Sequence, residues 1–146
     1  MMNKKYPIPQ QVFDNIYAQV PRLTVELIVK TPDGIVLTKR NIEPEIGTWH
    51  IPGGTVYFGE TLHDAVYRVA QNELGVSVKI NELLGYIEYP DLSKNGYKGW
   101  PIGVAFEVEI SAGELKGSDQ GEEVKIFNKI PENIFPDQAK FLKVYL

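Results

Sequence analysis

A pair of adjacent glycines and one carboxylate farther along the chain are the residues best suited to chemistry. Gly53 and Gly54 have no side chains, so their backbone carbonyls can approach a ligand closely. Glu73 offers a carboxylate, and a hard cation such as Mg²⁺ or Mn²⁺ takes oxygen ligands of both kinds. The pattern therefore predicts a site for a hard divalent cation between the glycine turn and Glu73.

This glutamate must be positioned by the helix expected over residues 61–74. At about 100° per residue, Val66 and Val69 fall within about 40° of Glu73, so the carboxylate shares the apolar stripe of its helix. An ionised carboxylate that faces inward needs a cation or several donors, or its pKa rises. The alternative is that Glu73, in the last turn, curls out to solvent or pairs with a Lys or Arg.

Both ends of this helix carry local signals. Thr61, followed three residues later by Asp64, resembles a capping box with Asp in place of Glu. Gly75 fits the left-handed position that follows a last helical turn. The helix is therefore expected to begin after Thr61 and to end before Gly75.

The glycine turn and the helix also share a family spacing. From Gly54, five residues precede Glu60, seven separate it from Arg68, four precede Glu73 and one precedes Gly75. This spacing resembles the Nudix box, the metal-binding loop–helix–loop of hydrolases that act on nucleoside diphosphates linked to another group. The resemblance implies structural roles for Gly54, Glu60, Arg68 and Gly75, with the arginine pairing with the first glutamate to hold the loop.

The box, residues 54–76, departs from the family at two positions. Val69 and Asn72 stand where the family has Glu, while Glu73 is retained. Three carboxylates there would support two or more divalent ions, whereas one carboxylate supplies a single negative charge. We therefore expect a single essential metal ion, Mg²⁺, with Mn²⁺ as the alternative.

The two departures match an unusual Nudix branch, the GDP-mannose mannosyl hydrolases, which also lack both glutamates. Residues 9–76 are similar to that branch, with a helix before the first strand, a Lys39-Arg40 pair and a Gly47-Thr48-Trp49 approach to the glycines. The later segment 119–123 resembles the metal-binding and catalytic loop of the branch. The resemblance therefore extends over most of the chain.

Roles carried over from the branch fall on five residues. The resemblance implies metal ligation by the carbonyl of Gly53, the carboxylate of Glu73 and the side chain of Gln120. It also implies that Arg40 is the phosphate-facing catalytic cation and that Glu26 contacts the substrate. The alternatives are a solvated strand-end charge for Arg40 and an ordinary loop amide for Gln120.

Three positions depart from the branch as well. Gly121 stands where the branch has its general-base His, Tyr89 falls near a second functional His, and Thr55 replaces a phosphate-side Arg. Glu122 and Glu123 are the candidates for a replacement base, and solvated loop charges are their alternative. These departures leave open whether attack occurs at the sugar carbon or at phosphorus.

Aromatic residues could contact a base or sugar. Tyr89 and Trp100 are the predicted substrate contacts, and Tyr86 and Tyr97 could also stack on a nucleobase. For each of them, packing in the core or at a rim is the alternative. His50 precedes the glycine turn and is either a phosphate ligand or base, or a strand residue satisfied by a neighbour.

The elements around the box alternate between helix and strand patterns. We expect helices over 9–20 and 137–146, a half-buried strand over 23–30, a polar loop over 91–99, and strands over 35–40, 76–87, 104–110 and 124–127. This interleaving indicates an α/β protein. The resemblance implies the Nudix fold, an α/β/α sandwich with a mixed β-sheet, as a single domain over residues 1–146.

Composition narrows the partners. A net charge of −4 argues against binding nucleic acid through a broad basic face, and no apolar run is long enough to span a membrane. Cysteine is absent from the sequence, which fits a cytoplasmic protein. The expected partner is a small-molecule nucleoside diphosphate derivative, and the branch suggests a homodimer.

These observations together predict a Mg²⁺-dependent Nudix hydrolase. Its expected substrate is a nucleoside diphosphate linked to another group, a nucleotide sugar such as GDP-mannose. Two alternatives stay open: a Nudix-fold module that binds a nucleotide without cleaving it, and an ADP-ribose-type pyrophosphatase. Turnover of a substrate panel separates the module from the enzymes.

Overall fold

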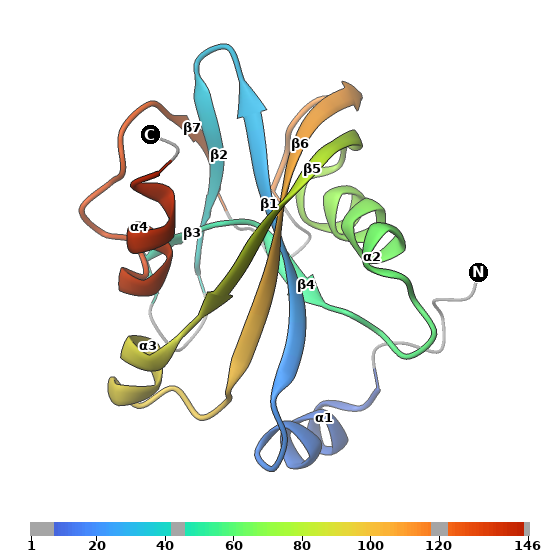
Figure 1. The fold of residues 1–146 in the computed structure, drawn as a ribbon, viewed down its shortest axis with the longest axis vertical. Helices are drawn as coiled ribbons and strands as arrows, with labels where there is room; N and C mark the ends of the chain where they lie inside the picture. The colour runs from blue at the N-terminus through green and yellow to red at the C-terminus, as the bar shows by residue number, and fades with distance from the viewer. Residues whose placement is uncertain (1–7, 42–45, 118–122, 145–146) are drawn as a thin grey trace.

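A mixed β-sheet lies between helices in the computed structural model, which describes residues 8–41, 46–117 and 123–144. Helix α2 (Leu62–Val69) covers one face of the sheet and α4 (Pro136–Leu142) covers the other (Figure 1). The sheet order is β3-β2-β1-β6-β5, with β4 paired to β1 and β7 paired to β2. The predicted α/β/α sandwich is confirmed. The strands are β1 (Arg22–Thr31), β2 (Gly34–Lys39), β3 (Trp49–His50), β4 (Gly53–Thr55), β5 (Ser77–Glu88), β6 (Pro101–Ala112) and β7 (Glu123–Phe127).

Strand β1 lies at the centre of the sheet. It runs parallel to β6 and antiparallel to β2 and β4. Residues 24–29 are all buried, so the prediction of a half-buried strand is wrong. Because helices cover both faces, the side chains expected in solvent, Thr24, Glu26 and Ile28, lie inside instead. Leu23, expected inside, is exposed.

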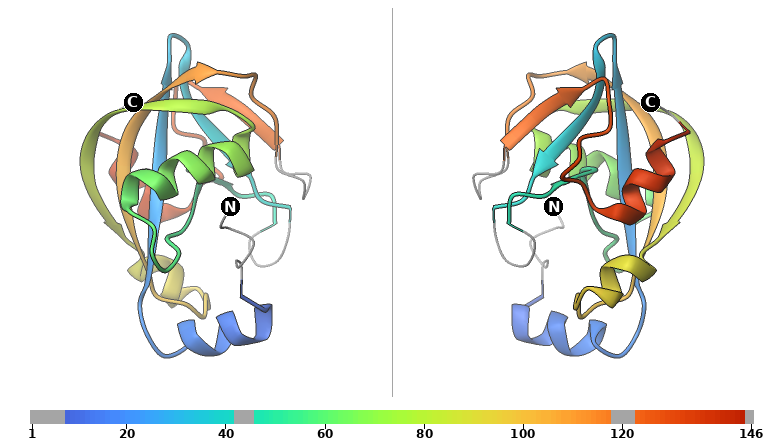
Figure 2. Two further views of the ribbon diagram at one scale, coloured as in Figure 1. Left: turned by 90° about the vertical axis from the view of Figure 1, so that its right-hand side faces the viewer. Right: turned by 90° about the vertical axis from the view of Figure 1, so that its left-hand side faces the viewer.

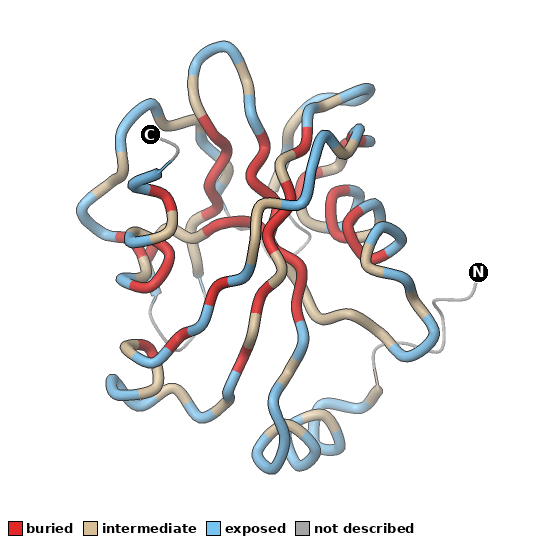
Figure 3. Tube along the Cα trace, viewed as in Figure 1, coloured by how far each residue is buried: buried red, intermediate tan, exposed pale blue. Residues whose placement is uncertain are grey.

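Two apolar cores lie on opposite faces of this sheet, and buried residues run along β1 and occur in both α2 and α4 (Figure 3). The first packs Val25, Leu27 and Val29 of β1 against α2. The second packs Ile28 of β1 against Leu142 of α4 and the segment around Tyr89. The alternating side chains of one strand therefore serve two cores, and Glu26 projects on the same face as Ile28.

The box helix is not a single α-helix. Helix α2 continues into a π-helical turn, Ala70–Leu74, which contains Glu73. Thr61 caps the helix, since its hydroxyl accepts the backbone N–H of Asp64 at 3.1 Å, and Gly75 has φ +69° as expected for the residue that ends it. The caps are confirmed, whereas the continuous α-helical geometry expected up to Leu74 is wrong in its last turn.

The remaining helices are short. Helix α1 (Gln10–Tyr17) precedes β1 and buries none of its residues, and its place at one end of the molecule is plain in both side views (Figure 2). Helix α3 (Pro90–Lys94) forms where a loop was expected, because two backbone N–H groups at its start donate to the carboxylate of Asp137. Helix α4 ends at Leu142, before the predicted end. In the described ranges, no helix has both the length and the apolar character to cross a membrane.

Candidate functional site

A pocket of about 230 Å³ opens where β1 and β4 meet the segments around Tyr89 and α4. Four of the residues predicted to act on substrate or metal line it: Glu26, Arg40, Gly53 and Tyr89. They come from four separate segments, and the fold brings them together. The other lining residues are Arg22, Thr24, His50, Ile51, Gly54, Leu92, Tyr97, Pro101, Phe135 and Gln138.

Glu26 is the buried carboxylate of this pocket, with 6% of its surface exposed. Glycines flank it on both neighbouring strands, Gly53 on β4 and Gly103 on β6. A Cβ at Gly53 would lie 2.6 Å from Glu26 Oε1, and one at Gly103 would collide with Oε2. The two glycines therefore make the room that this carboxylate occupies.

A chain of hydrogen bonds links Glu26 to α4. The hydroxyls of Thr24 and Tyr89 donate to Glu26 Oε2 at 3.1 and 2.8 Å. Gln138 Nε2 in turn donates to the Tyr89 hydroxyl at 2.8 Å, and Gln138 Oε1 accepts the backbone N–H of Ile51 at 2.7 Å. These bonds orient the carboxylate and tie the pocket floor to the closing helix.

Burial dominates the electrostatics of this network. Desolvation raises the pKa of Glu26 from 4.5 to about 7, although the hydrogen bonds from Tyr89 and Thr24 and the charges of His50 and Arg22 oppose it. Desolvation, helped by the charge of Glu26, also raises the pKa of Tyr89 well above 10. Tyr89 is therefore a hydrogen-bond donor at neutral pH, and Glu26 changes its charge near neutrality.

Two arginines lie in the pocket wall. Arg40 follows β2 and lines the pocket. Arg22, at the start of β1, donates to Thr55 Oγ1 at 2.8 Å and to the Tyr97 hydroxyl at 3.0 Å. The branch resemblance implies a phosphate-side arginine at the position of Thr55, and Arg22 brings a guanidinium beside Thr55 from another strand.

His50 is both satisfied by neighbours and part of the pocket wall. Its ring lies within hydrogen-bonding distance of Thr38 Oγ1, at 3.2 Å from Nε2, and of the Ile51 carbonyl, at 3.0 Å from Nδ1. It also stacks on Phe135, with ring centroids 5.6 Å apart. The two roles considered for His50, a phosphate ligand or base and a strand residue satisfied by a neighbour, are therefore compatible.

The structural residues of the box form a closed set of contacts. Arg68 Nε and Glu60 Oε2 lie 2.7 Å apart, and Glu60 Oε1 accepts the backbone N–H of Tyr57 at 2.8 Å. Arg68 also donates to the carbonyl of Thr55 at 2.7 Å, and its guanidinium lies 3.8 Å from the centroid of the Tyr57 ring. The pair is nearly buried, with side-chain exposures of 13% and 7%, so Arg68 holds the loop onto the helix.

Strand β4 separates the box helix from the pocket. Gly54 lines the pocket, while a Cβ built on it would lie 3.0 Å from Cγ2 of Val69. Val69, one of the two positions where the family has Glu, is therefore buried apolar packing against the glycine turn. Asn72, the other position, is exposed.

The predicted metal ligands are described in part. Glu73 is half-buried in the π-helical turn and does not line the pocket, whereas Gly53 does. Among the described residues, no group of three or more His, Cys, Asp or Glu side chains could hold a metal ion. One carboxylate and one backbone carbonyl are hard oxygen donors, and they fit a cation such as Mg²⁺ that keeps several waters and binds substrate phosphates. Gln120 lies outside the described residues.

Two further predicted site residues that the structure describes, Trp100 and Glu123, do not line the pocket. Trp100 is 50% exposed, and its carbonyl accepts the backbone N–H of Arg22. Glu123, a candidate base, begins β7 as an exposed residue with its carboxylate 3.4 Å from Lys39 Nζ. Glu122 lies outside the described residues, as does Gly121.

Two residues of the pocket carried no signal in the sequence. Arg22 is a single arginine after a proline, and Gln138 is a single amide near the chain end. The first reaches the site because Thr24 pairs with Thr55 across β1 and β4, and the second because α4 packs under Tyr89. Both placements are products of tertiary structure.

Comparison with known proteins shows which family the chain resembles. A model of the NUDIX domain family matches residues 20–144. The low-salt glycan biosynthesis protein Agl8 of Haloferax volcanii is 37% identical over 139 residues, which are 92% of this chain and 88% of that protein. The ADP-ribose pyrophosphatase of Methanocaldococcus jannaschii is 34% identical over 128 residues, 86% of this chain and 73% of that protein.

The fold has solved counterparts as well. The MutT NUDIX hydrolase of Burkholderia pseudomallei matches with a TM-score of 0.76 at 23% identity, over 88% of this chain and 100% of that one. A bifunctional NMN adenylyltransferase/ADP ribose pyrophosphatase of Francisella tularensis, in complex with AMP and a Mn ion, matches with a TM-score of 0.69 at 18% identity, over 92% and 46% of the two chains. These likenesses confirm the predicted fold.

Proposed function

The chain belongs to the Nudix family, and from that premise we propose that it is a Mg²⁺-dependent hydrolase of a nucleotide sugar such as GDP-mannose. Family membership makes it a hydrolase of a nucleoside diphosphate linked to another group. The Haloferax relative is named for glycan biosynthesis, which supports a sugar as that group. The Methanocaldococcus relative supports a second candidate reaction, the cleavage of ADP-ribose.

One observation carries this proposal: Arg22, Arg40 and the buried Glu26 share one pocket wall beside Gly53. The two guanidiniums suit the charges of a diphosphate, to which arginine can donate two parallel hydrogen bonds. Glu26, oriented by Thr24 and Tyr89, presents a carboxylate that accepts a sugar hydroxyl. A single pocket therefore offers both cationic donors and a carboxylate acceptor.

Gly53 and Glu73 are the described residues that would hold the metal ion, and the branch resemblance adds Gln120. When bound, the divalent cation supplies charge neutralisation of the phosphates and polarises the leaving group. The chain itself binds the diphosphate through Arg22 and Arg40 and orients the sugar through Glu26. A single ion per chain is the expected stoichiometry, and electron paramagnetic resonance of a Mn²⁺ titration measures it.

The decisive experiment is hydrolysis of a panel of nucleotide sugars and ADP-ribose in ¹⁸O-water with Mg²⁺. Phosphorus NMR and mass spectrometry then show which product carries the label. Label in the sugar indicates attack at carbon, as in the mannosyl hydrolase branch, and label in phosphate indicates attack at phosphorus. Preference for ADP-ribose with label in phosphate would establish the second candidate reaction.

A thermal-shift measurement with GDP and Mg²⁺ accompanies the panel. Stabilisation by GDP together with turnover of a nucleotide sugar supports the proposal. Stabilisation without turnover of any substrate would overturn it in favour of a nucleotide-binding module.

A further inference from the structure

A second concave surface adjoins the pocket, between α1 and the turn at residues 96–99. This groove, which we call the α1 groove, has a volume of about 620 Å³, within the range of small-molecule sites. Phe13 and Tyr17 of α1 line it, packed edge to face with ring centroids 4.7 Å apart, and Tyr97 lines it from the turn. Its other lining residues are Asp14, Ala18, Arg22, Gly96, Lys98 and Gly99.

The α1 groove is continuous with the pocket because Arg22 and Tyr97 line both. The hydrogen bonds from Arg22 to Thr55 and Tyr97 use two of the five N–H donors of a guanidinium. As far as the described residues go, three donors are left for a phosphate at this junction. A molecule with its diphosphate beside Arg22 would therefore place one end in the pocket and the other in the α1 groove.

One aromatic ring of the α1 groove, that of Tyr97, is held in place by contacts within the chain. The Tyr97 ring packs against the second core, and its backbone N–H donates to the Leu92 carbonyl at 3.3 Å. Gly99 leaves room for the ring, since a Cβ there would lie 3.0 Å from Tyr97 Cε2. A pre-positioned ring loses little freedom when a flat group stacks on it.

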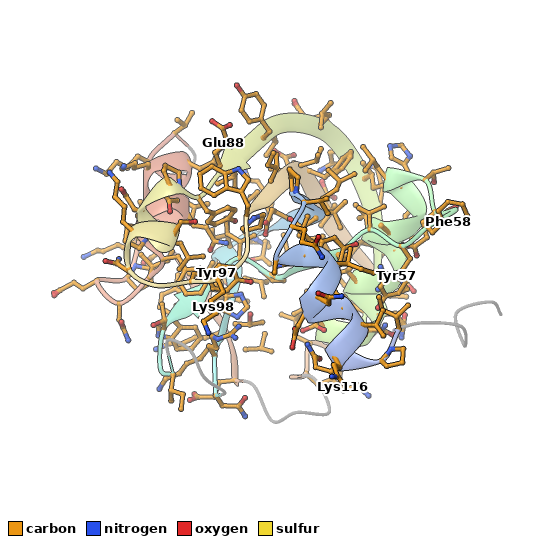
Figure 4. All side chains as sticks on the ribbon, turned by 90° about the horizontal axis from the view of Figure 1, so that it is seen from below. Tyr57, Phe58, Glu88, Tyr97, Lys98 and Lys116 are labelled. Atoms are coloured by element: carbon orange, nitrogen blue, oxygen red, sulfur yellow. The ribbon has the colours of Figure 1, made fainter. Side chains whose placement is uncertain are left out.

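Two exposed charged residues line this groove from different segments. Asp14 projects from α1, where Gln10 donates to its Oδ1 at 2.7 Å, and Lys98 belongs to the turn at residues 96–99. Figure 4 shows α1 crossing this end of the molecule with Tyr97 and Lys98 beside it. A carboxylate accepts hydrogen bonds and an ammonium donates them, so the groove offers both an acceptor and a donor.

We propose that the α1 groove binds the nucleobase of the substrate and that Asp14 makes it selective for guanine over adenine. This inference rests on the proposed function, because it assigns the base of that substrate. Guanine carries two adjacent donors, N1–H and N2–H, for a carboxylate, and O6 and N7 acceptors for Lys98. Adenine offers Asp14 a single donor beside a ring-nitrogen acceptor, which a carboxylate repels.

The test is isothermal titration calorimetry of the full chain with GDP, ADP and inorganic pyrophosphate in metal-free buffer. GDP is expected to bind about tenfold or more tightly than ADP, the discrimination of one bidentate contact. Asp14→Asn should reduce the GDP/ADP ratio to about threefold or less, while pyrophosphate affinity stays the same. Asp33→Asn, the same charge change in the exposed β1–β2 turn, should leave all three affinities unchanged.

The outcomes separate the two proposals. Equal affinities for GDP and ADP in the wild-type chain, with pyrophosphate still bound, would overturn the base assignment alone. This comparison uses only the wild-type chain, so it tests the base assignment even where a variant does not fold. A chain that binds neither GDP nor pyrophosphate, in a repeat titration with Mg²⁺ as well, would overturn the proposed function, and an unchanged ratio in Asp14→Asn would exclude Asp14 as the selecting residue.

Discussion

The two sides of strand β4 are built in different ways. On the side of α2, the contacts join residues close in sequence: Thr61 caps Asp64 three residues away, and Arg68 pairs with Glu60 eight residues away. On the pocket side they join residues far apart, since Tyr89 and Glu26 are separated by 63 residues and Gln138 and Ile51 by 87. The box side is therefore a local scaffold, whereas the pocket side exists only in the folded chain.

The carboxylates of the two sides differ in the same way. Although desolvation opposes it, hydrogen bonding and the charge of Arg68 hold the pKa of Glu60 below 4.5, so Glu60 is an ionised structural group. Burial raises the pKa of Glu26 to about 7, because its close partners are neutral hydroxyls. The scaffold keeps its charge paired, and the pocket keeps a carboxylate that is costly to ionise.

The largest effect should come from Glu73→Gln, which tests whether the box side also serves chemistry. The change keeps the size of the side chain but removes its negative charge. We expect kcat to fall by about 100-fold or more, as when one electrostatic stabiliser of a transition state is lost, with the fold unchanged. Turnover in a Mg²⁺ titration, together with circular dichroism, measures both.

Glu82→Gln is the matched control for this variant, because Glu82 is an exposed glutamate of β5. Its turnover and metal dependence should equal those of the wild type. Unchanged turnover with normal metal dependence in Glu73→Gln would remove this residue from the site and leave the box a purely structural element.

Arg68→Ala should give the largest loss of stability. It leaves Glu60 nearly buried without its cation, and breaking a buried pair costs about 3 to 5 kcal/mol. Urea denaturation at pH 7 measures the loss. Because the folded pKa of Glu60 lies below its unfolded value, the stability from this pair is present above pH 4.5 and is lost as pH falls through the folded pKa.

Arg68→Lys is the matched control, because it keeps the positive charge but removes the planar guanidinium. It should recover part of the lost free energy of unfolding but not the bidentate contact to Glu60 and the Thr55 carbonyl. Equal stability of Arg68→Ala and the wild type near neutral pH would show that the box loop is held by its apolar packing instead.

Glu26→Gln tests the pocket side through pH. A folded pKa of about 7 against 4.5 means that the native state holds this proton more tightly, so wild-type stability falls as pH rises from 4.5 through 7. Glu26→Gln has no carboxyl group to ionise at this position, so its stability does not fall for this reason. Its stability relative to the metal-free wild type should rise by up to about 3 kcal/mol between pH 4 and pH 8, the equivalent of about 2.5 pKa units.

Urea titrations of both proteins at the two pH values measure this difference. Glu114→Gln, a change at an exposed loop carboxylate, should show no such change with pH. A difference between Glu26→Gln and wild type that is the same at pH 4 and pH 8 would mean that Glu26 titrates as an ordinary surface group.

The contrast between the two sides also explains which features could be predicted from the sequence. The box helix, its caps at Thr61 and Gly75 and the pairing of Glu60 with Arg68 were all predictable, because each depends on a fixed local spacing. The π-helical turn was not predictable, because a helical wheel assumes about 100° per residue throughout. It therefore does not represent a turn that contains an extra residue.

Among the pocket residues, the family resemblance singled out Glu26 and Arg40, whereas Gly53, His50, Tyr89 and Tyr97 were also candidates from their residue types and positions. The hydrogen-bond partners of Glu26 could not be read from β1, because apolar alternation does not reveal that helices cover both faces. Arg22 and Gln138 depend on strand register and helix docking, which no local pattern records.

The smallest effect belongs to Thr61→Ala, which tests how much the local scaffold depends on single contacts. The variant loses one cap to the backbone N–H of Asp64 and should lower the free energy of unfolding by about 1 kcal/mol, without changing kcat. Thr61→Ser keeps the capping oxygen and should be close to wild type. Since the long-range contacts of the pocket lie on the other side of β4, a loss of activity in Thr61→Ala at full stability would show that the two sides are coupled.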